Sequence, residues 1–285
     1  MLAEEWEADR IRDFSSEHYG AVQAGGVAPA VAETIASRLM AAREPIVITS
    51  YVGRKADAVR ALEKLAMLCG IKVYEFSPTA ISVSRESPCF GGFDPGKALA
   101  GADLGLLLDV DVPWLPKYAQ EDPSTEWIHI DVDTIKKDFP MWGFRTDMRI
   151  QADCATVLQQ VIEIVEQRAD DTFRKTVAAR VEGWEGANTQ RRQAVAKVAQ
   201  DVGKKGAISP AHVCATLGKL ISPTDIVVNE AVRNTFAVLN QIPRTEPLSL
   251  IGCAGGGLGY SAGIALGAKL AKPDVRVVQV VGDGG

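Results

Sequence analysis

The segment PIVITSYVGRKADAVRALEKLAMLCGIKVYEF (residues 45–76) contains the pattern of a strand, a helix and a second strand in succession. Residues 45–49 are a short apolar run, which is typical of a buried strand. From Arg54 to Cys69 apolar residues recur at helical spacing, and Gly70 stands where a glycine commonly ends a helix. Residues 71–76 predict the next strand. Buried strands that alternate with helices indicate a parallel α/β sheet.

The same alternation continues on both sides of this segment. Helical spacing precedes it between residues 31 and 39, and strand-like runs follow at residues 104–110 and 127–132. Residues 153–180 have the spacing of one long helix. We therefore expect residues 28–183 to form a Rossmann-like central domain with a doubly wound parallel sheet.

A polar, charged break separates this domain from a second one. Apolar residues become sparse between residues 184 and 206, which predicts a linker. Ser209 and Pro210 then suit the N-cap and first turn of a new helix. Beyond them, strand-like runs at residues 226–228, 248–251 and 275–281 alternate with helical spacing, so residues 207–285 predict a second, partial α/β domain.

The composition is that of an ordinary globular protein. Of its 285 residues, 47% are apolar and 24% are charged, and the formal net charge is -5. Without a cationic excess, neither nucleic acid nor an anionic membrane is an expected partner. The five cysteines lack Cys-x-x-Cys spacing, and the acidic first residues do not resemble a targeting segment, so we expect a reducing, cytoplasmic environment. Residues 247–268 carry no charge, but their many glycines favour a loop and a buried helix over a membrane span.

The stretch VRVVQVVGDGG (residues 275–285) carries the clearest chemical signal. It predicts a strand that places Asp283 at its carboxyl end, which is the edge where open α/β sheets bind ligands. A carboxylate oxygen suits Mg²⁺, and the flanking glycines let a phosphate approach the backbone closely. Taken alone, Gly-Asp-Gly-Gly is more simply explained as an ordinary turn.

A glycine-rich segment precedes this strand. Gly259, Gly263 and Gly267 recur every four residues, which predicts close packing of one helix face against a neighbour. The run of residues 255–257 is different, because packing does not require three glycines but a cofactor pressed against main-chain groups does. The segment therefore predicts a ligand-binding loop followed by a packed helix.

Residues 254–285, AGGGLGYSAGIALGAKLAKPDVRVVQVVGDGG, resemble the cofactor-binding domain of thiamine-diphosphate-dependent enzymes of the acetolactate synthase and benzoylformate decarboxylase type. Upstream, DIVVNEAVRN is similar to the family's strand and loop beneath the diphosphate, and residues 28–170, with the phrase IHIDVD, are similar to its central domain. In that family Gly-Asp-Gly opens a magnesium and diphosphate motif that an asparagine closes, and this chain has the opening half. The resemblance implies that residues 1–27 are the tail of a missing N-terminal domain and that residues 207–285 are a truncated cofactor domain.

The resemblance implies a role for each matching residue. Asp283 would bind Mg²⁺, with Gly282 and Gly284 shaping its loop. Leu258 occupies the position of the apolar side chain that holds thiamine diphosphate in its bent form. Gly256 matches the residue whose carbonyl oxygen receives the amine of the aminopyrimidine.

Three further residues admit two interpretations. Arg233 and Asn234 align with diphosphate contacts of the family, and a solvated helix start explains them equally well. Glu230 follows a strand, so it belongs either to the diphosphate loop or, more simply, to a first helical turn whose dipole favours an acid.

The resemblance also implies an activity. The family's members act on 2-keto acids by decarboxylation or carboligation, as lyases or transferases, and the full-length enzyme would be a homo-oligomer. In that family the catalytic glutamate lies in the N-terminal domain. The resemblance therefore implies no catalytic residue in this chain, and we expect the isolated chain to be inactive. The family's central domain binds FAD or ADP in some members, so the resemblance does not decide whether this chain binds FAD. The alternative is a non-catalytic nucleotide-binding (ADP or FAD) or assembly module.

Other polar residues of the central domain are less specific. Asp109, Asp111, Asp131 and Asp133 follow two predicted strands, and they are either a metal site or solvated loop acids. The loop TSYVGRKAD lacks the glycine fingerprint of dinucleotide-binding folds, which disfavours a NAD-dependent dehydrogenase. The three histidines are scattered and predict no ligand cluster.

Overall fold

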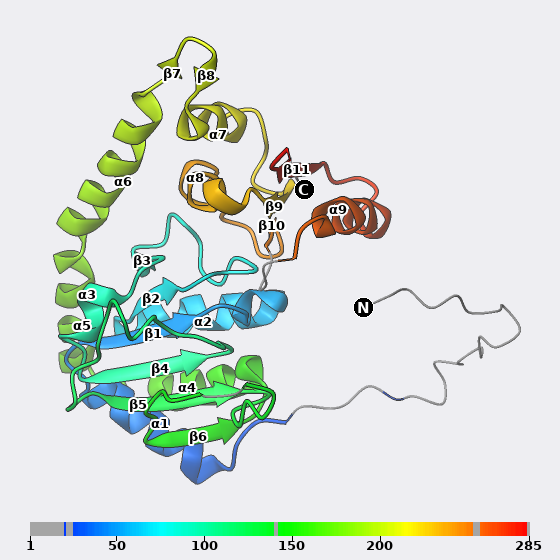
Figure 1. The fold of residues 1–285 in the computed structure, drawn as a ribbon. Coiled ribbons are helices and arrows are strands. Elements are labelled where there is room, and N and C mark those ends of the chain that lie inside the picture. Colours follow the sequence, from blue (N-terminus) through cyan, green and yellow to red (C-terminus); the bar gives the residue numbers. More distant parts are fainter. Residues whose placement is uncertain (1–19, 21–24, 140–141, 253–256, 284–285) are drawn as a thin grey trace, which may run out of the picture.

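The structure, a computed structural model, describes residues 20, 25–139, 142–252 and 257–283. It has two lobes, each built on its own parallel sheet (Figure 1). Two successive helices, α5 (Asp171–Gly183) and α6 (Glu185–Gln200), run along one side of the molecule from the first lobe to the second. The expected parallel α/β architecture is therefore confirmed.

The first sheet has six strands in the order β3-β2-β1-β4-β5-β6. They are β1 (Pro45–Thr49), β2 (Lys72–Glu75), β3 (Phe90–Gly92), β4 (Leu104–Leu108), β5 (Glu126–Asp131) and β6 (Met148–Gln151). The strand order reverses between β1 and β4, as in doubly wound Rossmann-like sheets. The sequence did not predict β3 or β6, because both are short and neither is a continuous apolar run.

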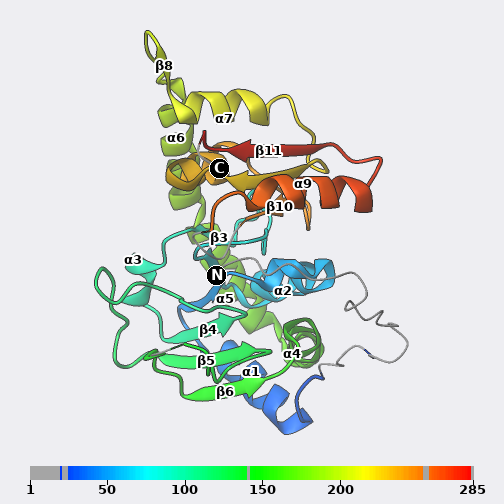
Figure 2. The same cartoon turned by 45° about the vertical axis from the view of Figure 1, so that its right-hand side comes forward.

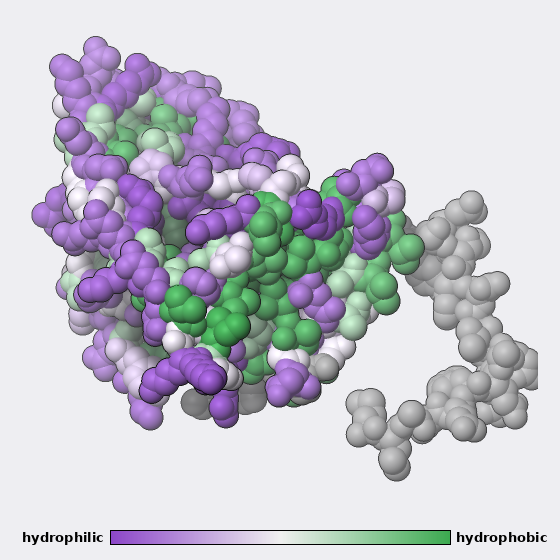
Figure 3. Space-filling view, turned by 90° about the horizontal axis from the view of Figure 1, so that it is seen from above, coloured by the Kyte–Doolittle hydropathy of each residue, from purple (hydrophilic) through white to green (hydrophobic). Residues whose placement is uncertain are grey.

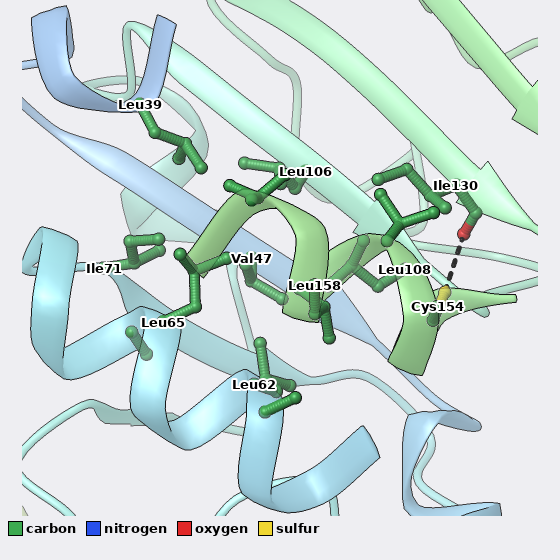
Figure 4. Close-up of a cluster of buried hydrophobic side chains, with 14 of the residues drawn as sticks. Leu39, Val47, Leu62, Leu65, Ile71, Leu106, Leu108, Ile130, Cys154 and Leu158 are labelled. Carbon is green, nitrogen blue, oxygen red and sulfur yellow. Dashed lines mark hydrogen bonds between the residues drawn. The ribbon is translucent and has the colours of Figure 1, made fainter. Parts of the chain in front are cut away.

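Three helices cover one face of this sheet. They are α1 (Pro29–Ala41), α2 (Ala56–Cys69) and α4 (Cys154–Arg168). In Figure 4, Leu62 and Leu65 of α2 and Leu158 of α4 lie against Val47 and Leu106 of the central strands, and all five are buried. This is the main hydrophobic core, and its burial is the principal stabilising contribution to the lobe.

The predicted single helix over residues 153–180 is wrong, because the structure has two helices there. α4 ends at Arg168, and the carboxylate of Asp170 accepts the N–H of Phe173 at 2.8 Å, which begins α5. An aspartate at this position is a favourable N-cap, so the break is locally encoded. Helical apolar spacing alone did not reveal it.

Aromatic side chains and loops, with the short helix α3 (Gly96–Leu99), cover the opposite face. The rings of Trp114 and Trp127 lie 5.0 Å apart, and both side chains are almost fully buried. Trp114 also packs edge-on against Phe144. Large aromatic rings here bury the area that crossover helices bury in other doubly wound folds.

The predicted linker, residues 184–206, is mostly helical and is docked on the first lobe. Lys72 Nζ donates to the carbonyl of Pro88 and to Asn188 Oδ1 of α6, and it lies 4.5 Å from the ring centroid of Trp184. Burial, and then the nearby Arg191 guanidinium, lower the pKa of Lys72 to about 8. After α6 the chain forms a small hairpin of β7 (Gly203–Lys204) and β8 (Ala207–Ile208).

This buried ammonium predicts a pH dependence of stability. An unfolded lysine has a pKa of about 10.4, so between pH 8 and 10 the unfolded chain binds more protons than the folded one. The free energy of unfolding should therefore rise with pH in this window, and it should rise less in Lys72→Met. Urea denaturation at several pH values measures both slopes. Lys64→Met removes a half-exposed lysine that pairs with Glu166 and should keep the wild-type slope; equal slopes in all three proteins would contradict the assignment.

The second sheet has three parallel strands in the order β10-β9-β11. They are β9 (Ile226–Glu230), β10 (Leu250–Ile251) and β11 (Val277–Val281), and the helices around them are α7 (Pro210–Gly218), α8 (Thr235–Gln241) and α9 (Tyr260–Ala271). Val227, Val238 and Leu250 belong to its small buried core. Figure 2 shows β11 above β9, with α9 beside them.

Close packing of the α9 glycines is not what the structure shows. A Cβ atom added at Gly263 or Gly267 would meet nothing within 4 Å, and Leu266 and Leu270 are 69% and 84% exposed. Figure 3, which looks down on the second lobe, shows hydrophobic residues gathered over the part of the molecule that carries α9. Among the described residues, no helix is both long and apolar enough to cross a membrane.

Candidate functional site

The carboxyl edge of the second sheet brings together segments that are far apart in sequence. β9 and β11 run parallel, with Glu230 paired to Val281. Asp283 therefore follows its strand on the same edge where Glu230 ends β9. The side chain of Asp283 is exposed, and it forms no ion pair with any residue that the structure describes. A carboxylate in this position is accessible to a cation.

Glu230 organises the start of α9 on this edge. Its buried carboxylate accepts the N–H of Gly259 and, at 2.9 Å, the N–H of Ser261. Hydrogen bonds from Ser261 and from the Gly259 backbone keep the pKa of Glu230 below its usual value. Gly259 has φ = 83°, a left-handed conformation that favours glycine. The expectation that Glu230 lies in a first helical turn is wrong, because Glu230 is the last residue of β9 and its carboxylate instead contacts the N-terminus of α9, where a helix dipole favours an acid.

A cavity of about 330 Å³ opens beside these groups. Leu258, which is 62% exposed, lies on its wall, and α8 contributes the ring of Phe236. Ser77 and Pro78 line it from the loop after β2, so both lobes form its walls. A cavity with both apolar and polar walls at the carboxyl edge of a parallel sheet is a common form of a ligand site.

The backbone around this cavity is strained at two positions. Val232 has φ = 44° and Ser77 has φ = 47°, and both residues line the cavity. A positive φ is especially unfavourable for a β-branched valine, because its branched Cβ crowds the backbone. Strain of this kind is concentrated at ligand sites, where the surrounding structure maintains it.

The other predicted site residues are placed as follows. Arg233 and Asn234 are exposed in the 3₁₀ helix η4 (Val232–Asn234) and do not line the cavity. Gly282 is exposed just after β11. Gly256 and Gly284 lie outside the described residues. The structure therefore brings Leu258 and Glu230 to the cavity and puts Asp283 on the same edge.

Sequence reasoning missed Ser77, Pro78 and Phe236. The first two belong to a loop of the other lobe, about 150 positions before β9 in the sequence. No local pattern signals that a loop will meet a distant sheet edge. Phe236 lies at helical spacing from Leu239, which predicts a buried helix face, and only the structure shows that its side chain is 58% exposed.

The four aspartates of the central sheet do not form a metal site. Lys136 Nζ lies 2.9 Å from Asp111 Oδ1 and 2.8 Å from Asp131 Oδ2, so an ammonium neutralises the pair. Asp109 is buried and pairs with Arg54 at 3.6 Å. No group of three or more potential metal ligands occurs among the residues that the structure describes.

The histidines also stay apart in the described regions. His129 is fully buried and stacks on Trp142 with ring centroids 4.9 Å apart. His212 Nδ1 lies 3.0 Å from the carbonyl oxygen of Ala199. His18 lies outside the described residues. Neither described histidine belongs to a metal or triad constellation.

The chain is similar to proteins of known function. Residues 233–285 match the family model "Thiamine pyrophosphate enzyme, C-terminal TPP binding domain". The chain is 25% identical to a benzoylformate decarboxylase of Pseudomonas aeruginosa, over 94% of this chain and 49% of that protein. It is also 25% identical to the large subunit of acetolactate synthase isozyme 3 of Escherichia coli, over 86% of this chain and 43% of the relative. The chain thus spans about half the length of the curated relatives it matches.

Solved structures share the fold. A thiamine diphosphate-dependent 4-hydroxybenzoylformate decarboxylase of Rhodococcus jostii RHA1 matches 93% of this chain and 48% of its own chain, with a TM-score of 0.69 and 20% identity. A benzoylformate decarboxylase of Polynucleobacter necessarius matches all of this chain and 50% of its own, with a TM-score of 0.67 and 16% identity. The resemblance noted in the sequence is confirmed: this chain is similar in sequence and fold to thiamine-diphosphate-dependent enzymes of the benzoylformate decarboxylase and acetolactate synthase type.

Proposed function

We propose that this chain supplies the central domain (residues 28–183), a linker (residues 184–206) and part of the cofactor domain (residues 207–285) of an enzyme that uses thiamine diphosphate and Mg²⁺ to act on a 2-keto acid. The observation that carries the proposal is the cavity at the carboxyl edge of the second sheet, with Leu258 on its wall and Asp283 on the same edge. The reaction is decarboxylation or carboligation, and the complete enzyme is a cytoplasmic homo-oligomer.

The residues at this edge fit the cofactor in part. Leu258 offers an exposed apolar side chain against which a bent cofactor could rest, and Glu230 holds the backbone next to it in place. Arg233 and Asn234 are exposed close to the strained Val232, where they could contact a diphosphate. When bound, thiamine diphosphate supplies a nucleophilic thiazolium carbon and an electron sink.

The ligand set for Mg²⁺ is the weaker part of the fit. Magnesium requires near-octahedral oxygen coordination, and in the described regions Asp283 belongs to no group of three or more potential metal ligands. Gly282 leaves its backbone open to a diphosphate oxygen. We therefore propose that Asp283 contributes one metal ligand and that this chain alone binds the cofactor weakly and turns over no substrate.

The alternative is a nucleotide-binding module. A cavity of about 360 Å³ lies between the ends of β1 and β4, and Arg54 and Lys55 line it together with Asp109 and Asp153. Both cations are already paired with these acids in this structure. ADP would have to displace the acids to reach the cations. Neither the matching family model nor the relatives named above point to FAD, and we do not propose it.

Thermal unfolding of the chain with thiamine diphosphate tests the proposal. The cofactor should raise the melting temperature more with Mg²⁺ than without, because a ligand that binds only the folded state stabilises it. Asp283→Asn should abolish the magnesium-dependent part, and Leu258→Ala should reduce the total shift. Asp274→Asn removes an exposed acid from the same lobe and serves as the control. The same measurement with ADP in place of thiamine diphosphate tests the alternative of a nucleotide-binding module.

Two outcomes would contradict the proposal. In the first, thiamine diphosphate and Mg²⁺ at millimolar concentration leave the melting temperature unchanged, whereas ADP raises it. This result would favour the nucleotide-binding module. The other concerns the isolated chain, for which we expect no release of carbon dioxide from pyruvate. Turnover of about one per second, an ordinary enzymatic rate, would show that the chain alone is a complete enzyme.

A further inference from the structure

A cavity of about 740 Å³ lies outside the candidate cofactor site, between the edge strand β3 and helices α6, α7 and α8. Its walls are mainly apolar, with Phe90 and Phe93 on one side and Val195 and Leu239 on others. Two hydrogen bonds tie its helices together. His212 of α7 contacts the carbonyl oxygen of Ala199 at 3.0 Å, and Gln241 Nε2 of α8 donates to the carbonyl of Val195 at 2.8 Å.

Two guanidinium groups lie over the ring of Phe90 in this cavity. The distances from the ring centroid are 4.6 Å for Arg85 and 4.7 Å for Arg191. Arg85 is neutralised by Glu75, whose carboxylate oxygen lies 2.6 Å away. Arg191 donates to the carbonyl of Phe90 but forms no ion pair with a carboxylate of the described residues. Arg191 is therefore a cation without an anion on the wall of an apolar cavity.

The surroundings of Arg191 make this charge unfavourable. Burial, and then the neighbouring Arg192, lower the pKa of Arg191. Lys72 is a further cation close to it. The cavity also has Glu86, His212 and Lys219 on its walls, but the Glu86 side chain is exposed and pairs with none of the described cations. A partly buried charge is stabilised most by a hydrogen-bonded counter-charge.

We propose that this cavity binds an organic anion whose carboxylate pairs with Arg191 and whose apolar body fills the space between Phe93, Val195 and Leu239. The volume is far larger than an inorganic anion needs, and the walls are mostly apolar, so the ligand must combine one charge with a hydrophobic group. This cavity shares Leu239 with the candidate cofactor cavity, but Arg191 and the other walls belong to it alone and it does not include the edge that carries Asp283. The inference therefore does not depend on the proposed thiamine chemistry.

Calorimetric titration of the full chain with three matched probes tests the charge requirement. 3-Phenylpropionate carries both features, 3-phenylpropionamide lacks the charge, and inorganic phosphate lacks the apolar body. The carboxylate should bind at least about tenfold more tightly than the amide, since a hydrogen bond to a charged group contributes that much or more. Phosphate should bind more weakly than the carboxylate. Equal affinity for acid and amide, or no binding of the acid at millimolar concentration, would overturn the proposal.

Substitutions locate the site. Arg191→Met should weaken binding of 3-phenylpropionate about tenfold. Arg192→Met removes a second positive charge from the wall of the same cavity and should change the affinity less than about threefold, because Arg192 already pairs with Glu185 at 3.2 Å. Ala196→Phe keeps every charge and fills the cavity, so it too should weaken binding, and it remains decisive if Arg191→Met does not fold. Leu258→Ala should leave the affinity for 3-phenylpropionate unchanged, because Leu258 lines the other cavity. Undiminished binding in Ala196→Phe, or loss of binding in Leu258→Ala, would place the probe elsewhere.

Discussion

Replacing Arg85 with methionine is expected to lower the free energy of unfolding by about 3–5 kcal/mol, because it would leave the Glu75 carboxylate buried without its counter-charge. Glu75 is fully buried, and Arg85 is 8% exposed. One carboxylate oxygen of Glu75 accepts the N–H groups of Ser82 and Val83, at 2.7 and 3.1 Å. The other carboxylate oxygen of Glu75 lies 2.6 Å from Arg85 Nη2. The pair therefore holds the loop after β2, which also lines the candidate cofactor cavity.

Urea denaturation measures this loss. The double variant with Glu75→Gln should recover part of the stability, because the uncompensated charge is then gone, and the resulting double-mutant cycle isolates the coupling. Arg43→Met is the control, since the Arg43 side chain is 89% exposed, and it should change the free energy of unfolding by less than about 0.5 kcal/mol. A loss below about 1 kcal/mol in Arg85→Met would mean that water or another group compensates Glu75.

Gly53→Ala is expected to lower the free energy of unfolding by about 2–3 kcal/mol, because the added methyl group has no space. A Cβ atom there would come within 3.0 Å of the carbonyl group of Ile81, which is backbone and cannot rotate away. The N–H of Gly53 also donates to Ser82 Oγ at 3.2 Å. Gly53 thus allows two loops at the carboxyl edge of the first sheet to touch.

Thermal or urea unfolding of Gly53→Ala and of Gly101→Ala makes the comparison direct. A Cβ atom at Gly101 would meet nothing within 4 Å, and its backbone has no positive φ, so this variant should be neutral or slightly stabilised. A similarly small change in the free energy of unfolding in both variants would show that the loop containing Ile81 moves aside with little loss of stability.

Local sequence was sufficient for most elements of the fold. The apolar run at residues 45–49 is the strand β1 with the same bounds, and Gly70 ends α2 with φ = 64°. The Rossmann-like class and the resemblance to thiamine-diphosphate-dependent enzymes also came from sequence. These features depend on residues that are neighbours along the chain, so their spacing is visible in the one-dimensional pattern.

Contacts between distant residues decided the rest. Glu230 holds the N-terminus of α9 from 29 positions away, and Lys136 pairs with Asp111, 25 positions away after β4. The Ser77 loop closes the cavity from the other lobe. The burial of a side chain depends on which elements pack together, and periodicity could not tell that the glycine face of α9 lies open. The sequence by itself determined most of the elements and the resemblance to thiamine-diphosphate-dependent enzymes, whereas only the tertiary structure decided which charges are paired, because pairing follows distances in space and not positions in the chain.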